Sequence, residues 1–564
     1  MFRQTGKVVP RAKKQVDYLV PIGIPYKGLN TRSPFGSMDP NDAIAVNNVL
    51  VETQGLRTRK GYTEWARDLP AVTPVHTIMN YYPGTYQTSS QTTGAPIGGG
   101  IEGPSPLGPG PGEIFAAQGT AIYDVTAGGT GPWTAEAGVT GPTPYWQAIN
   151  YQNVAGNFLL IANAGGGYAY YNGTVWAQPT LGVAPGQISG VDPVKIVWVV
   201  SWKERIWFIE KDSSRAWYLP VGQITGVATL FDFGSQMDHG GPLIFLGNWT
   251  VDGGAGVDDM LVAIGSQGDV AIYKGTDPND ATTFGLHGTW YSGPLPAGYR
   301  AVDASGGDIL ILTQFGVVPI TKLFQPTYLA AQSQEHLSWN VDPLIASMMR
   351  QYGTISGWQI MDIAKEELLL IRFPELLGTT LENTWLAFKT TTKAWSTLSE
   401  LPFAHILNTG PLSYAGTLDG RIVRAFNGEL DDVRLATPNL GVGIKCRVTP
   451  AYNHLEAPGH NKVLKMIRPY FLSVSVPSVS ITVLANYDLA AAAIVPAVPI
   501  NLAGGKWGVG LWDVALWGGL TTNLHKWLGA EGWGTVLTVQ LDYITGGETI
   551  LTAEDYWCSK GGVL

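Results

Sequence analysis

Histidine and acidic residues are the side chains of this chain that could support catalysis or bind a metal. The eight histidines are scattered, and none stands at metal-ligand spacing from another. His239 follows Asp238, but an adjacent pair does not define a site. The GxSxG, HExxH, GxxxxGKS/T and helix-preceding GxGxxG patterns are absent. The sequence therefore predicts no catalytic residue, no cofactor-binding residue and no metal ligand, and we expect a protein that is not an enzyme.

Two acidic loops are the candidates for calcium binding. Asp252, Asp258 and Asp259 lie around a run of glycines, and residues 277–280 repeat the Asp-Pro-Asn-Asp tetrapeptide that begins at Asp39. Neither loop has the alternating ligands and closing glutamate of an EF-hand. Because aspartate is also a common turn and capping residue, we predict turn and cap roles, with calcium as the alternative.

Tryptophans are concentrated near the C-terminus. An indole face can stack on a sugar ring, but a glycosidase would also need two carboxylates at a fixed separation. The glycines between these tryptophans favour burial in a sandwich core or in a subunit interface, with sugar stacking as the alternative. The tryptophans concerned are Trp507, Trp512, Trp517, Trp527 and Trp533.

Cys446 and Cys558 are the only cysteines and lie far apart in the sequence. No CxxC motif or Cys/His cluster accompanies them, so neither a disulfide framework nor a zinc site is indicated. We predict two buried thiols. A single bridge that ties the C-terminal region together is the alternative.

The elements that must position any site are short β-strands. An apolar strand, a turn rich in Gly or Asn, and a second strand with Trp or Tyr recur at residues 158–176, 205–219 and 260–273. An Asp-Gly turn at residues 419–420 joins two further alternating strands, which is a hairpin signal. Repeats of this kind, roughly 40 to 60 residues apart, predict the blades of a β-propeller over residues 63–440.

Longer alternating strands follow the predicted propeller and favour a β-sandwich over residues 441–564. Residues 1–62 are a basic arm followed by a segment dominated by turn residues. We predict that residues 21–62 pack outside the propeller, against the sandwich or against a neighbouring subunit. The expected fold class is all-β: a propeller with an additional C-terminal sandwich, or platform, domain that the N-terminal segment completes.

Two short helical segments are expected within this β-rich chain. Residues 39–42 can cap one helical turn over residues 43–48. Residues 341–352 have apolar side chains at helical spacing, and Asn340 stands at the position of a cap.

Charge is distributed unevenly along the chain. Residues 1–60 carry ten Lys/Arg and four Asp/Glu, residues 61–440 carry 17 and 32, and residues 441–564 carry eight of each. The excess of acidic residues over 61–440 has two interpretations. The chain is an ordinary acidic protein, or this region repels a polyanion that has to pass it without binding. Charged residues make only 14% of the chain and aromatic residues 11%, which leaves apolar surface for neighbours, so we expect an oligomer.

Two segments are predicted to be exposed. Residues 83–113 are rich in Gly, Pro, Ser and Thr and have no periodicity, so they form a long loop, either without a role or in contact with a partner. The basic arm at residues 3–14 is a solvated tail or a contact for nucleic acid or an acidic partner. No secretory signal is evident, and the most apolar tract, residues 490–500, is too short to span a bilayer. We therefore expect synthesis and folding in a cytoplasm.

Several short segments, in this order, resemble tail proteins of short-tailed bacteriophages. The segments are short and rich in glycine, and together they cover most of the chain except the 83–113 insertion. The segments are residues 27–32, 47–48 and 55–62 near the N-terminus, residues 203–208, 268–278, 307–313 and 316–319 in the centre, and residues 507–508 and 511–517 near the C-terminus.

The resemblance implies a tail nozzle, also called a tail tubular or DNA-stabilisation protein. Such a protein forms a hexameric ring below the portal and adaptor of a virion, and tail fibres, spikes or a needle join at its side or tip. The ring extends the DNA channel, retains packaged DNA and permits its ejection, without sequence-specific binding. The competing interpretations are a carbohydrate-binding or carbohydrate-degrading propeller and a plain scaffold propeller of the host cytoplasm. No motif marks a gate residue.

Overall fold

A computed structural model describes residues 17–71, 73–83, 112–252, 257–324, 336–375, 383–410, 412–438, 440–489, 493–499 and 522–563. About 53% of the chain lies in strands and about 6% in helices, which confirms the all-β prediction. The chain divides into two compact units, a propeller unit of Arg59–Ile444 and a platform unit of Met1–Thr58 with Lys445–Leu564. The basic arm at residues 3–14 and nearly all of the 83–113 insertion lie outside the described residues.

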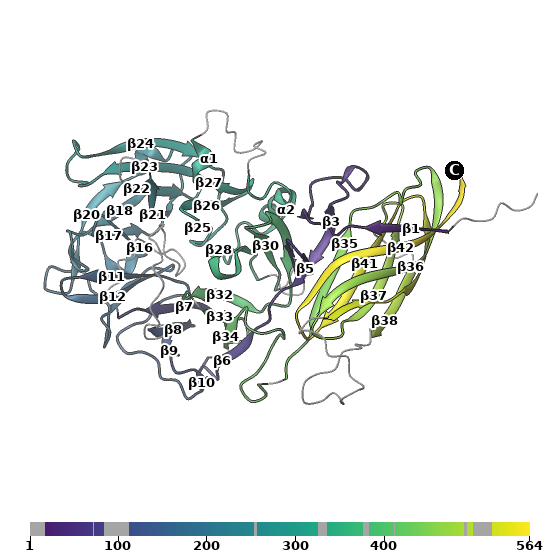
Figure 1. The fold of residues 1–564 in the computed structure, drawn as a ribbon. Coiled ribbons are helices and arrows are strands. Elements are labelled where there is room, and N and C mark those ends of the chain that lie inside the picture. The colour runs from purple at the N-terminus through teal and green to yellow at the C-terminus, as the bar shows by residue number, and fades with distance from the viewer. Residues whose placement is uncertain are drawn as a thin grey trace, which may run out of the picture. The chain divides into compact units, whose positions relative to one another are not determined.

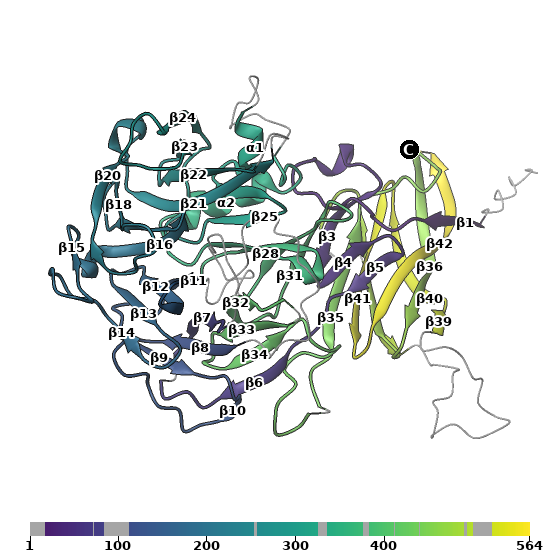
Figure 2. The ribbon, with the colours of Figure 1, turned by 60° about the vertical axis from the view of Figure 1, so that its left-hand side comes forward.

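Seven sheets make up the described part of the propeller unit, and they follow one another in sequence order round a common centre (Figures 1 and 2). A short parallel pair, β15 (Ile188–Ser189) and β19 (Gly226–Val227), stands apart from them. The first three sheets are β7 (Val75–Tyr81), β8 (Glu113–Gln118) and β9 (Ala121–Asp124); β11 (Trp146–Asn153), β12 (Gly156–Asn163), β13 (Tyr168–Tyr171) and β14 (Trp176–Ala177); and β16 (Ile196–Trp202), β17 (Arg205–Glu210), β18 (Arg215–Tyr218) and β20 (Thr229–Asp232).

The last sheet of the propeller unit differs from the others because it contains a strand from the start of the unit. β6 (Thr63–Arg67) pairs antiparallel with β34, so the two ends of the unit share one sheet. The fourth to seventh sheets are β21 (Leu243–Asp252), β22 (Val257–Gly265), β23 (Asp269–Gly275) and β24 (Phe284–Tyr291); β25 (Val302–Ser305), β26 (Asp308–Thr313) and β27 (Gly316–Pro319); β28 (Gln359–Ile363), β29 (Leu368–Arg372), β30 (Trp385–Lys389) and β31 (Ala394–Leu398); and β32 (Phe403–Asn408), β33 (Ser413–Thr417), β34 (Ile422–Ala425), β6 and β10 (Gly129–Thr130).

Hydrogen bonds of side chains join each sheet to the next and the seventh back to the first. This closed series identifies the sheets as the blades of a seven-bladed propeller. In blade order the bonds run from Asn150 Nδ2 to Asn80 O, Val199 N to Gln147 Oε1, Trp198 Nε1 to Leu246 O, Trp249 Nε1 to Gly307 O, Asp362 N to Asp303 Oδ2, Asn408 Nδ2 to Asp362 O, and Ile78 N to His405 Nδ1.

Apolar strands fill the space between the blades. β16 has the sequence IVWVVSW and is buried on both of its faces, because each sheet is covered by a neighbouring blade on either side. Trp198 packs against Phe245 of the next blade at 5.5 Å between ring centroids. The predicted hairpins at residues 158–176, 205–219 and 260–273 and the turn at residues 419–420 are confirmed.

The platform unit is a sandwich of two sheets, as predicted, and strands from both ends of the chain form it. Phe471 and Tyr543 contact one another between the sheets at 5.2 Å, in an edge-to-face arrangement. One sheet contains β1 (Asp17–Ile22), β4 (Val49–Glu52), β5 (Gly55–Thr58), β36 (His460–Ser473), β39 (Thr522–His525), β40 (Leu528–Gly534) and β42 (Thr549–Val563); the other contains β2 (Gly28–Leu29), β3 (Asp42–Asn47), β35 (Ile444–Pro450), β37 (Ser478–Ala485), β38 (Ala493–Pro499) and β41 (Leu537–Thr545).

The N-terminal segment completes the platform through backbone pairing. β1 and β5 pair antiparallel with β42, and β3 pairs antiparallel with β35. The prediction that residues 21–62 pack outside the propeller is therefore confirmed up to Thr58, after which the chain enters the propeller unit.

The helical predictions have mixed outcomes. The helix predicted over residues 341–352 is α2 (Asp342–Tyr352), but Val341 and not Asn340 stands at its N-cap position. No helical turn follows residues 39–42, because residues 42–47 form β3 and Asp39 Oδ1 instead accepts the backbone N–H of Asn41 in a turn. Among the described residues, the other short helices are α1 (Ile320–Leu323), η1 (Phe35–Ser37), η2 (Pro193–Lys195), η3 (Gly234–Gln236) and η4 (Ala364–Glu366).

Both cysteines are buried free thiols, so the predicted state is confirmed and the alternative bridge is not formed. Cys446 lies near the Thr58 hydroxyl, at 3.6 Å between Sγ and Oγ1. Burial raises the pKa of the Cys558 thiol to about 12. The Cys558 thiol therefore stays protonated at neutral pH.

Candidate functional site

The segment of residues 59–62 closes the propeller. The Arg59 guanidinium forms two parallel hydrogen bonds with the Asp431 carboxylate, each 2.7 Å long, and its side chain is fully buried. Lys60 pairs with Glu366 at 2.9 Å, and the ring of Tyr62 packs edge-on against Phe403 at 5.4 Å. Residues 59–62 therefore hold the two ends of the propeller unit together. They belong to the segment at residues 55–62 that resembles the phage tail proteins.

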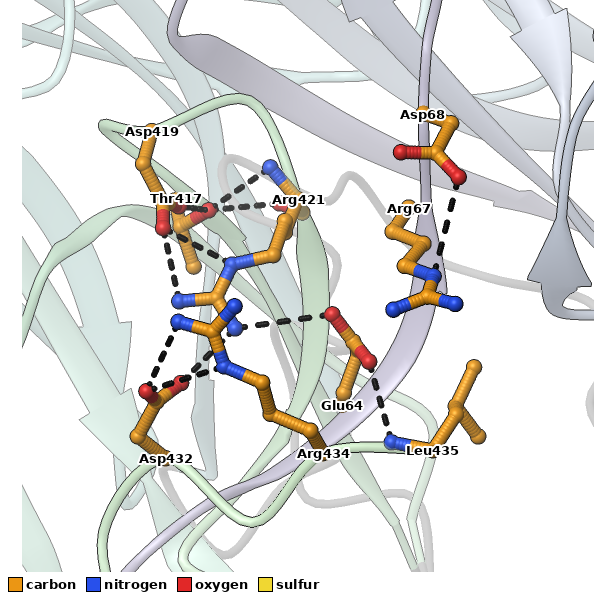
Figure 3. Close-up of polar contacts among 9 residues, drawn as sticks. All are labelled: Glu64, Arg67, Asp68, Thr417, Asp419, Arg421, Asp432, Arg434 and Leu435. Carbon is orange, nitrogen blue, oxygen red and sulfur yellow. Dashed lines mark hydrogen bonds and ion pairs between the residues drawn. The ribbon is translucent and has the colours of Figure 1, made fainter. Parts of the chain in front are cut away.

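A network of ion pairs continues this closure beside β6 (Figure 3). The Arg421 guanidinium contacts Asp419 at 2.6 Å, Asp432 at 2.7 Å and the buried Glu64 of β6 at 3.5 Å. The second oxygen of Glu64 accepts the backbone N–H of Leu435 at 3.0 Å. Every carboxylate of the network has a basic or backbone partner, and the contacts of Glu64 tie β6 to the segment that follows β34.

The acidic loops at residues 252–259 and 277–280 have different outcomes. Asp277 Oδ1 accepts the backbone N–H of Asn279, and Asp280 Oδ1 accepts that of Thr282, so the turn prediction is confirmed for both residues. Asp252 ends β21, and Asp258 and Asp259 lie in β22, so the turn prediction is wrong for these three residues, because the two strands pair up to this point. Asp259 contacts Lys203 at 3.3 Å, while residues 253–256 lie outside the described residues. In the part of the chain that the structure describes, no three His, Cys, Asp or Glu side chains are arranged to hold a metal ion.

Residues that are distant in sequence form a basic cluster within the propeller. Arg300 precedes β25 in the fifth blade, yet its guanidinium donates to His76 O at 2.8 Å, Thr77 Oγ1 at 2.6 Å and Trp146 O at 3.0 Å in the first and second blades. It thereby joins blades that are not neighbours in the ring. Tyr145 stacks on His76 at 4.7 Å and lies below the Arg300 guanidinium at 5.6 Å.

Arg372 and Glu375 extend this cluster. Glu375 Oε1 lies 3.6 Å from Arg372 Nη2 and 3.8 Å from His76 Nε2. Gln359 is paired with Arg372 in the register of β28 and β29, so both side chains project from the same face of the sheet. The Glu375 carboxylate therefore faces one buried guanidinium group and one imidazole ring.

Burial sets the protonation states of the cluster. It lowers the pKa of His76 to about 3, with smaller contributions from Arg372 and Arg300. It also lowers the pKa of His405 well below the ordinary value, again with help from both arginines. The pKa of Arg300 falls to about 10 through burial, so its guanidinium remains charged at neutral pH while both histidines are neutral.

One sheet of the platform carries aromatic side chains on its outer face. Trp533 is 68% exposed and Trp557 is 40% exposed, and Trp527 contacts Trp557 at 5.8 Å. Of the two predicted environments, the sandwich core is wrong for Trp533 and the subunit interface stays a prediction. Trp533 faces outward because β40 alternates and the inward position beside it is Gly532, whose Cβ would lie 2.3 Å from Val483. Trp507, Trp512 and Trp517 lie outside the described residues.

A buried carboxyl group titrates near neutral pH within the platform. Glu554 of β42 is 3% exposed and accepts a hydrogen bond from the Tyr556 hydroxyl at 2.9 Å. Burial raises the pKa of Glu554 from 4.5 to about 7, although the Tyr556 hydrogen bond opposes the change. The folded platform therefore holds this proton more tightly than the unfolded chain does.

Because its folded pKa is raised, Glu554 should make platform stability depend on pH. The free energy of unfolding of the platform is highest below pH 4.5, where Glu554 is protonated in both the folded and the unfolded state. It falls as pH rises from 4.5 through about 7, by about 3 kcal/mol in total. We expect Glu554→Gln to remove this dependence and to stabilise the platform at pH 8, as measured by hydrogen exchange of β42 at pH 5 and pH 8. Glu531→Gln, at an exposed position of β40, is the matched control and should leave the dependence unchanged.

No protein-family model matches the chain, and no curated protein matches it. Among solved structures, Sqt1 of Saccharomyces cerevisiae has 13% sequence identity and a TM-score of 0.32, over 70% of this chain and 96% of Sqt1. YCF48 bound to D1 peptide has 12% identity and a TM-score of 0.26, over 69% and 98%. An exo-β-1,3-galactanase from Phanerochaete chrysosporium, determined with galactose, has 10% identity and a TM-score of 0.21, over 72% and 95%. These values do not indicate a ligand or an activity for this chain.

The basic cluster was not predicted from the sequence. Its members stand at positions 76, 145, 300, 359, 372 and 405, and no local pattern connects them. Several of these residues lie near the start of the first strand of a blade. This shared position could have identified them from the sequence only if the blade boundaries had been known. No helix of the described residues is long and apolar enough to cross a bilayer.

Proposed function

We propose that this protein is a structural subunit of a virion tail, a nozzle that forms a ring around the DNA channel. The resemblance of the segments at residues 27–32, 55–62, 203–208 and 268–278 to tail proteins of short-tailed phages supplies the class of protein. The observation that supports assembly into a ring is the exposed aromatic face of the platform, which includes Trp533 on an edge strand. Such an apolar face is stabilised by burial against another subunit.

The charge of the propeller unit agrees with this proposal. Arg59–Ile444 contains 19 Lys/Arg and 32 Asp/Glu, a formal charge of −13, whereas a protein that grips DNA presents an excess of positive charge. In the proposed ring, the acidic propeller repels the DNA backbone, so the genome slides past it without binding. The proposed partners are further copies in a hexamer, the tail adaptor protein, fibres or a needle, and the passing genome.

Light scattering of the purified protein, with negative-stain images of the same sample, tests the proposal. We expect rings of about six copies, the order that the family resemblance implies. Trp533→Ser should shift the mass toward the monomer without changing the far-ultraviolet dichroism. Val183→Ser replaces an exposed apolar side chain of the propeller and should leave the rings intact. A protein that stays monomeric at high concentration and with tail adaptor added would contradict the nozzle.

Carbohydrate binding by this propeller-containing protein is the second candidate function, and the exposure of Trp533 on its platform is the observation that favours it. An exposed indole can stack on a sugar ring, and Trp527 and Trp557 provide further ring surface on the same sheet. Glycan-array binding that Trp533→Ser abolishes, or release of reducing sugar, would support this function in place of the nozzle. Absence of both would remove it.

A further inference from the structure

Two buried polar groups of the basic cluster lack hydrogen-bond partners. Gln359 is 1% exposed, and neither its amide oxygen nor its amide nitrogen has a partner. His76 Nδ1 is also buried without one. Leaving such a group unpaired destabilises the folded state, so an unpaired donor and acceptor on one buried side chain indicate a missing ligand.

The guanidinium of Arg372 is held by few contacts for a buried cation. Its Nη1 donates to Gly357 O at 3.4 Å, and its Nη2 lies 3.6 Å from Glu375. Both distances are long for a charge-assisted hydrogen bond, which is usually about 2.7–2.9 Å. The Glu375 side chain is 32% exposed, so the carboxylate beside Arg372 stands on the side of the cluster that solvent reaches.

We propose that Arg372 and Gln359, next to His76, bind a small oxyanion that retains a hydroxyl group, such as hydrogen phosphate, in place of the Glu375 carboxylate. The anionic oxygens accept from Arg372 and from the Gln359 amide nitrogen. The hydroxyl donates to the Gln359 amide oxygen, which an anion without a proton leaves unpaired. This site is independent of the proposed nozzle function, and either can fail without the other.

The choice of anion follows from this pairing. Sulfate and phosphodiesters carry acceptor oxygens only, so they satisfy Arg372 but not the amide oxygen of Gln359. We expect roughly tenfold weaker binding of sulfate than of phosphate, since one buried acceptor stays unpaired. Hydrogen carbonate is smaller than phosphate and also has a hydroxyl group. The ratio of the two dissociation constants therefore indicates which size of anion the site accepts. Dimethyl phosphate stands for the backbone of nucleic acid and should behave as sulfate does.

Titration calorimetry and thermal unfolding of the full chain, at fixed ionic strength and pH 7.5, test the site. The probes are sodium phosphate, sulfate, hydrogen carbonate and dimethyl phosphate, against chloride. We expect phosphate at about ten times its Kd to raise the unfolding midpoint of the propeller by roughly 2 °C. An equal response to phosphate and sulfate would show that the site does not select for the hydroxyl group, and no response beyond chloride would show that water alone fills the site. Either result would overturn the proposal.

Two substitutions with opposite effects separate binding from general stabilisation. Gln359→Leu removes the unpaired amide, so it should fold at least as well in chloride and lose the phosphate response by about tenfold or more. Glu375→Gln removes the competing carboxylate and should tighten phosphate binding by about fivefold. Gln223→Leu makes the same exchange as the first variant at an exposed position and should change neither value. A phosphate response that survives Gln359→Leu would also overturn the proposal.

Discussion

Replacing Arg59 with Met is expected to destabilise the propeller by about 3–5 kcal/mol. The substitution removes the guanidinium that holds both oxygens of Asp431 at 2.7 Å and leaves a carboxylate buried without its counter-charge. It also removes a hydrogen bond of 3.1 Å from Arg59 Nη2 to Ser399 O. For a unit of this size, the unfolding midpoint should fall by roughly 5 °C. Denaturant unfolding and hydrogen exchange of β6 and β34 measure the effect.

Variants at the same pair distinguish the loss of pairing from the loss of bulk. Arg59→Lys keeps the charge but loses the two-pronged geometry, so it should retain only part of the stability. The double variant Arg59→Met with Asp431→Leu should be less unstable than the sum of the single changes, because no charge is left buried alone. Arg434→Met breaks the half-exposed pair with Asp432 and should cost less than about 1 kcal/mol. A loss for Arg59→Met as small as that would refute a closing role for this pair.

Replacing Gly61 with Ala is the second large effect, at about 3 kcal/mol. A Cβ at this position would lie 1.9 Å from the carbonyl oxygen of Leu430, and backbone cannot move away as a flexible side chain can. Gly61 is also fixed on both sides, because its N–H donates to Gly428 O and its carbonyl accepts from Asn427 N, each at 2.9 Å. The methyl group therefore has to separate two backbone segments that hydrogen-bond to each other.

Gly285→Ala is the matched control for this substitution. Gly285 lies on the exposed outer strand β24 of the same unit, and a Cβ there meets nothing within 4 Å. Alanine also has less freedom than glycine in the unfolded chain, so Gly285→Ala should be neutral or slightly stabilising. Denaturant midpoints of the two variants give the comparison. Equal midpoints for Gly61→Ala and Gly285→Ala would show that residues 59–62 do not close the propeller.

The strand content and the two-part organisation followed from the sequence because they depend on local patterns. Apolar strands next to Gly-containing turns, as at residues 260–273 and 419–420, can bury their side chains only as hairpins. The longer alternating strands within residues 441–564, such as β41, likewise indicate sheets with distinct inner and outer faces. The buried state of Cys446 and Cys558 follows from the absence of any partner motif. The strand and hairpin predictions depend on residues that lie within about ten positions of each other, and the prediction for the cysteines depends on no partner at all.

Tertiary structure alone decided the contacts that span the chain. Arg59 meets Asp431, 372 residues later, and Arg300 meets His76, 224 residues earlier, because the ring of blades brings them together. Trp533 faces outward because Gly532 is the residue that fits against Val483, which a count of tryptophans does not show. The turn at Asp39 leads into a strand and not into a helix because β35 supplies backbone partners for β3. Local propensity determines the elements, whereas ring closure and the pairing of both chain ends determine which polar side chains are buried together.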